Sequence, residues 1–130
     1  MSRILHVIAA LLLASPAAAQ QTGWGAAQRV DVTLSNFKFQ PAVLHLRSGH
    51  PVLLRLTNAS GGGHDFTAAK FFAAAEIRPE DRGAVRQGSL ELEGHATRDI
   101  AVIPRAGRYP VKCTHTFHKF MGMSGEIVVD

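Results

Sequence analysis

The sequence predicts an all-β fold, a small antiparallel β-sandwich with a short helical insertion around residues 67–86. Short segments of alternating polar and apolar residues recur along the chain, which is the period-2 pattern of half-buried strands. Glycine and proline residues separate these segments and mark turns. The 130 residues, of which 46% are hydrophobic and 18% charged, suffice for one domain with its own core.

The expected strands follow from this alternation. Residues 29–34 (RVDVTL) form the first strand, residues 37–39 continue it, and Pro41 ends it. The next two strands are expected at 43–46 and 51–56, with a turn between them. The later candidates lie at residues 89–92, 98–103, 109–113 and 126–129.

One segment departs from the strand pattern. Residues 67–76 (TAAKFFAAAE) are rich in alanine, and Thr67 is available as an N-cap, so a short helix is predicted there. The sequence Pro79-Glu80-Asp81 predicts a further helical turn before Gly88. These two pieces make up the helical insertion.

The first 19 residues have the features of a secretory signal peptide, namely Arg3, an apolar stretch over 4–14 and the small residues Ala17-Ala18-Ala19. The apolar run of about 11 residues is shorter than the roughly 20 needed to span a bilayer. We therefore expect a signal peptide at 1–19 cleaved near Ala19, an irregular lead-in at 20–28 and the β-domain at 29–130. Such a protein would be periplasmic, with no stable membrane insertion.

The chain carries 14 Lys and Arg against 10 Asp and Glu, a formal net charge of +4. The basic residues are scattered, without the basic run that is typical of nucleic-acid binding. This charge therefore favours weak steering toward partners with acidic surfaces, and not a nucleic acid.

The single cysteine, Cys113, is unusual in an exported protein, where a thiol without a partner is buried, paired between molecules or bound to a metal. Its neighbours favour a metal, because residues 113–123 (CTHTFHKFMGM) hold one thiol, two imidazoles and two thioethers. Thiolate, thioether and imidazole all suit copper. A short loop cannot surround an ion alone, and His64 is the best distant candidate because three preceding glycines allow a tight turn.

Three motifs then resemble the cupredoxins, the small blue copper proteins. They are residues 63–66 (GHDF), residues 107–113 (GRYPVKC), and Cys113-x4-His118-x4-Met123 followed by SGEIVV. The resemblance covers residues 29–130 and implies a Greek-key, cupredoxin-like sandwich. It also implies one copper ion, cycling between Cu(I) and Cu(II), with His64, Cys113 and His118 as the strong ligands and Met123 as the axial ligand.

Some positions leave alternatives open. Met121 could replace Met123 as axial ligand, but it would leave only two residues between itself and His118. His115 is expected to lie at the surface or to contact the ligand residues without binding the ion itself. Asp65 either accepts hydrogen bonds from the backbone or hydroxyl of Thr114 or is a plain turn residue.

The remaining histidines and aromatic residues have simpler interpretations. Surface positions are expected for His45, His50 and His95, and core positions for Phe37, Phe39, Phe66, Phe71 and Phe72. The apolar residues around His118 either form a docking patch or fold inward; they are Phe117, Phe120 and Met121.

Through the resemblance, the sequence predicts a one-electron carrier between periplasmic redox partner proteins. The alternative is a periplasmic protein that binds and delivers copper without electron transfer. An enzyme with Cys113 as nucleophile is disfavoured, because no oxyanion motif or second metal cluster is visible. Nothing in the sequence requires more than a monomer.

Overall fold

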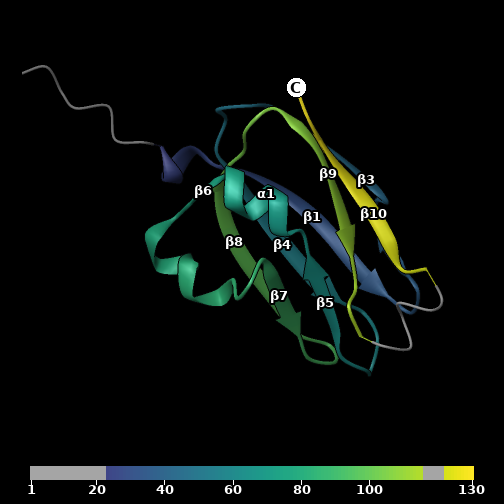
Figure 1. Cartoon of the computed structure of the whole chain (residues 1–130). Helices are drawn as coiled ribbons and strands as arrows, with labels where there is room; N and C mark the ends of the chain where they lie inside the picture. Colours follow the sequence, from purple (N-terminus) through teal and green to yellow (C-terminus); the bar gives the residue numbers. More distant parts are fainter. Residues whose placement is uncertain (1–22, 116–121) are drawn as a thin grey trace, which may run out of the picture.

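The computed structural model describes residues 23–115 and 122–130, which form two five-stranded sheets packed against each other (Figure 1). The first sheet has the order β2-β1-β4-β8-β6, with bounds Lys38–Gln40, Gln28–Ser35, Val52–Asn58, Thr97–Ile103 and Glu76–Ile77. The second has the order β3-β10-β9-β5-β7, with bounds Val43–Leu46, Ser124–Val129, Gly107–Lys112, His64–Thr67 and Ser89–Leu92. The predicted β-sandwich is therefore confirmed.

The sandwich was predicted to be antiparallel, but each sheet contains one parallel pair. β1 runs parallel to β4, with Val32 opposite Leu56, and β3 runs parallel to β10. Alternation specifies which face of a strand is buried but not the direction of its neighbour. Here β2 and β3 carry the chain toward the other sheet and back, which supplies the crossover that a parallel pair needs.

The first expected strand is also two strands. The chain reverses at Asn36 and Phe37, so that Ser35 pairs with Lys38 and β2 runs antiparallel to β1. Phe37 has a φ of +68°, a left-handed conformation that ends an extended run. The expected strand end at Pro41 is confirmed, since β2 stops at Gln40.

The helical insertion contains the α-helix α1 (Ala69–Ala74) and the 3₁₀ helix η2 (Pro79–Ala84), with the short strand β6 between them. The expected cap is wrong, because Ala68 holds the N-cap position and Thr67 belongs to β5. The Thr67 hydroxyl is engaged elsewhere, by Asp65 and Ser89. The lead-in includes one 3₁₀ turn, η1 (Trp24–Ala26), and the expected signal peptide lies outside the described residues.

The core lies between the sheets and under α1. Phe39, Phe66, Phe71 and Phe72 are buried as predicted, whereas Phe37 is only half-buried at its hairpin. Phe66 meets both Phe39 and Phe72 edge to face, with ring centroids 5.7 and 6.2 Å apart. Each such ring stabilises the fold by roughly 1.5–3 kcal/mol through burial. Within the described part of the chain, no helix is long and apolar enough to cross a membrane.

Candidate metal centre

Three of the predicted ligand residues lie at one end of the second sheet, where β9 has β5 on one side and β10 on the other. His64 begins β5, Cys113 follows the last residue of β9, and Met123 precedes β10. Thr67, three residues after His64, and Ser124, directly after Met123, both lie opposite Lys112, the residue before Cys113. This register brings the three ligand residues to the same end of the sheet. β9 ends and β10 begins at this same end of the sheet (Figure 1).

Cys113 and His64 form the buried centre of this end of the sandwich. The thiol Sγ lies 3.9 Å from the imidazole Nδ1, and neither residue is exposed to solvent. The backbone N–H of Asp65 donates to Sγ at 3.4 Å. Burial raises the pKa of the Cys113 thiol, while the backbone N–H groups of Asp65 and His115 oppose that rise. The thiol is thus shielded from solvent oxidants and faces an imidazole nitrogen.

Met123 is fixed beside Cys113 through the backbone. The Cys113 N–H donates to the Met123 carbonyl at 3.1 Å, and only 1% of Met123 is exposed. The other predicted ligand, His118, and the alternative axial ligand, Met121, lie outside the described residues. The apolar patch expected around Phe117 and Phe120 also falls there.

Asp65 connects the two segments that carry His64 and Cys113. Its buried carboxylate accepts hydrogen bonds from the Thr114 N–H at 2.9 Å and from the Thr114 hydroxyl. Thr67 donates to the same carboxylate at 2.7 Å. The prediction that Asp65 accepts from Thr114 is confirmed, and the carboxylate holds β5 to the start of the loop after β9.

His115 lies at the outer side of this connection. Its side chain is 36% exposed, and its Nε2 lies 2.7 Å from a Glu91 oxygen and 3.8 Å from an Asp65 oxygen. Ligand atoms of these three residues lie within 4.8 Å of one another, but Asp65 is already engaged by Thr67 and Thr114. The cluster is therefore a hydrogen-bonded network that orients His115. The histidines predicted at the surface are exposed: His45, His50 and His95.

A pair of residues that the sequence analysis missed lies behind His64. Ser60 Oγ is 2.8 Å from the His64 Nε2, and Asn58, which is 1% exposed, bonds to Ser60. The Asn-x-Ser spacing before a glycine run is typical of a side-chain-stabilised turn. That spacing could have identified the turn, although not its contact with the imidazole.

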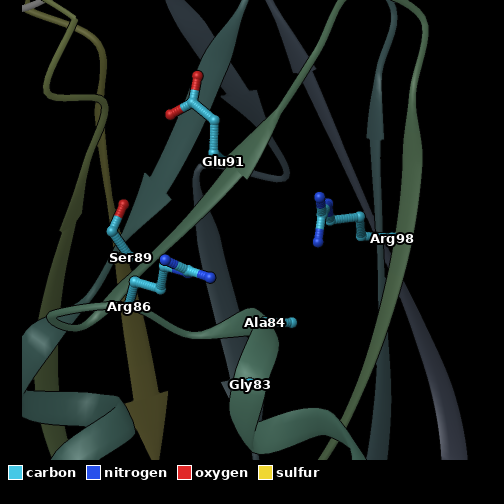
Figure 2. A pocket seen from close by; sticks show the side chains of 6 residues that line it. All are labelled: Gly83, Ala84, Arg86, Ser89, Glu91 and Arg98. Carbon is cyan, nitrogen blue, oxygen red and sulfur yellow. The ribbon is translucent and has the colours of Figure 1, made fainter.

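A pocket of about 370 Å³ lies beside the Glu91 end of this network. Figure 2 shows Arg86 and Arg98 pointing toward each other across it, with Ser89 and Glu91 on β7. Within residues 23–115 and 122–130, neither guanidinium has an ion-pair partner. The pocket is thus a positively charged hollow adjoining the outer side of the candidate centre.

Comparisons with known proteins show a similarity to cupredoxin-like domains. The family model described as a cupredoxin-like domain matches residues 3–129. Similar solved structures include auracyanin B (19% identity, 81% of this chain and 90% of that one, TM-score 0.60). Others are dithionite-reduced auracyanin from the photosynthetic bacterium Roseiflexus castenholzii (15%, 82% and 99%, 0.61) and the "blue" copper protein auracyanin A from Chloroflexus aurantiacus (16%, 78% and 99%, 0.53). No curated protein sequence matches.

Proposed function

Because the chain belongs to the cupredoxin-like family, we propose that it is an exported type 1 copper protein that carries single electrons between redox partner proteins. The observation that supports this function is the buried Cys113 thiol facing the Nδ1 of His64 at 3.9 Å. The two come from segments 49 residues apart in the sequence. A thiol and an imidazole converging in a buried site are two of the three principal donors of an electron-transfer copper site.

The donor chemistry of the described residues fits a copper ion. In the proposal, His64, Cys113 and His118 are the strong ligands and Met123 is the weak axial one. His118 enters by its spacing after Cys113, since it lies outside the described residues. Bound copper would supply the one-electron couple between Cu(I) and Cu(II). Cys113 would act as a thiolate, because a bound cation outweighs the effect of burial on its pKa.

The surrounding residues support a site whose shape is set in advance. Asp65 holds β5 to Thr114, and the Cys113 N–H is held by the Met123 carbonyl. These bonds restrict the movement of His64, Cys113 and Met123. Little rearrangement between two oxidation states is what an electron carrier requires. The complete burial of His64 and Cys113 also favours a carrier over a copper-delivery protein, whose ion must reach solvent or a partner's ligands.

The proposal also includes export of the protein and redox partners with acidic surfaces. Residues 1–19 would act as the signal peptide, and the mature monomer would work in the periplasm. Arg86 and Arg98 line a shared hollow near the candidate centre, which favours redox partners with acidic surfaces. No catalysis is assigned to the chain.

The test is the visible absorption and electron paramagnetic resonance spectrum of the purified protein loaded with Cu(II). We expect intense thiolate-to-copper absorption and a narrow hyperfine splitting, both lost in Cys113→Ser. His115→Gln is the matched control and should keep both signals, because His115 bonds to Glu91 outside the proposed ligand set. A pale spectrum that does not depend on Cys113, or rapid loss of copper to a chelator, would overturn the electron-carrier function in favour of copper delivery.

A further inference from the structure

A chain of hydrogen bonds runs from Asn58 through Ser60 to the ring of His64. The two hydrogens of Asn58 Nδ2 are shared among three backbone carbonyls, those of Gly62 at 2.8 Å, Glu93 at 3.0 Å and Leu92 at 3.3 Å. Because Nδ2 faces only acceptors, the orientation of this buried amide is fixed. Its Oδ1 therefore points toward Ser60, where it accepts from the backbone N–H at 3.0 Å.

The Ser60 hydroxyl has one hydrogen to donate, and its neighbours determine where that hydrogen goes. Ser60 Oγ lies 2.8 Å from Asn58 Oδ1 and 3.3 Å from the Gly62 carbonyl, and both atoms can only accept. Two oxygen atoms 2.8 Å apart with no hydrogen between them would repel each other, so the hydrogen points to Asn58 Oδ1. Toward the His64 Nε2, at 2.8 Å, the hydroxyl oxygen is then left as an acceptor.

The tautomer of His64 follows from this arrangement. If Ser60 Oγ accepts from Nε2, the neutral imidazole carries its proton on Nε2 and its lone pair on Nδ1. Nδ1 is the atom that lies 3.9 Å from Cys113 Sγ. The bonds of Asn58 and Ser60 thus present an unprotonated nitrogen to the side where the thiol lies.

Hydrogen bonds also hold the backbone at Ala59 and Ser60. The His95 N–H donates to the Ser60 carbonyl at 3.0 Å, and the Ala59 N–H donates to the Leu34 carbonyl at 2.8 Å. The turn that precedes the three glycines is therefore tied both to the end of β1 and to the turn between β7 and β8. These two bonds fix the backbone position from which the Ser60 hydroxyl reaches His64.

We propose that Ser60, oriented by Asn58, is a positioning residue that fixes the Nε2–H tautomer and ring orientation of His64. Its importance for copper rests on the proposed function, in which Nδ1 of His64 is the donor atom. Residues that orient a metal-binding imidazole typically change metal affinity about 10–100-fold when removed. Ser60→Ala should therefore weaken copper binding by a factor in about that range, whereas Ser60→Thr, which keeps the hydroxyl, should restore it.

The first experiment uses the metal-free protein, and its decisive result comes from the unaltered chain. In ¹⁵N-histidine-labelled protein at about pH 8, where imidazole is neutral, NMR should show His64 protonated on Nε2 alone. The same spectrum of Ser60→Ala should show a mixture of tautomers, and that of Ser60→Thr the single one. Protonation on Nδ1 in the unaltered protein would overturn the proposal even if Ser60→Ala does not fold.

The second experiment measures copper affinity by chelator competition in the same three proteins. Weaker binding in Ser60→Ala together with recovery in Ser60→Thr supports the positioning role. Unchanged tautomer and affinity in a folded Ser60→Ala would refute it. Failure of the proposed function is distinguishable, because the unaltered protein would then lack thiolate-to-copper absorption while its NMR spectrum still showed the Nε2–H tautomer.

Discussion

Replacing Asp65 with alanine should destabilise the metal-free protein strongly, because the carboxylate connects β5 to the start of the loop after β9. It accepts from Thr67 at 2.7 Å, from the Thr114 N–H at 2.9 Å and from the Thr114 hydroxyl. A hydrogen bond to a charged group contributes about 1.5–3 kcal/mol. Thr114 is exposed and Thr67 keeps its bond to Ser89, so water and Ser89 replace part of that loss.

We therefore expect Asp65→Ala to lower the free energy of unfolding by about 2–4 kcal/mol, less than the sum of three such bonds. For a domain of about 100 residues this corresponds to a fall in Tm of roughly 10–25 °C. Asp65→Asn is the matched control, since it keeps the shape and one acceptor oxygen and should lose about 1–2 kcal/mol.

The assay is thermal and urea unfolding of the metal-free protein, followed by circular dichroism. Metal-free protein is essential, because bound copper would itself stabilise the fold and conceal the loss. A loss below about 1 kcal/mol in Asp65→Ala, smaller than even one charged hydrogen bond, would refute the reasoning. It would mean that Thr114 and Thr67 find equivalent partners when the carboxylate is absent.

Two further predictions concern packing and pH. In Gly94→Ala the added Cβ would lie 2.2 Å from the Gly61 carbonyl oxygen, so urea unfolding should show a clear loss of stability. Gly62→Ala is the control and should lose much less stability, because its Cβ would meet nothing within 4 Å. Equal losses in the two variants would contradict this packing argument. Hydrogen bonds from Arg55 hold the pKa of Asp99 below its ordinary value. The ionised Asp99 therefore stabilises the fold at pH values above its unfolded-state pKa. This stabilisation is lost as the pH falls through the lower pKa that Asp99 has in the folded state. In Asp99→Asn the fall in stability on acidification should be shallower. An unchanged slope in acid titrations followed by circular dichroism would contradict the assignment.

Much of the fold could be predicted because strand alternation is a local property. The strands at 43–46 and 89–92 coincide with β3 and β7, and the expected helical turn at Pro79 is η2. The direction of neighbouring strands is not local, so the parallel pairs could not be derived from the pattern. The strand β5 was also missed, because its four residues are all buried or half-buried and show no alternation.

The sequence by itself determined which donor residues are available to the candidate centre. A single thiol followed by imidazoles and thioethers, with a distant histidine after three glycines, contains the donors that copper prefers. Through the resemblance to the cupredoxins it also suggested Asp65 as a link to Thr114, which the structure shows.

Only the tertiary structure decided how the described donors are held. The roles of Asn58 and Ser60 depend on carbonyls of β7 and its following turn, more than 30 residues away, which fix an amide that would otherwise be free to flip. Hydrogen-bond direction is set by all the neighbours of a group at once, and the sequence does not specify which neighbours those are. The residue types therefore predict which metal the site suits, whereas the register of β5, β7, β9 and β10 determines which atom of His64 faces Cys113.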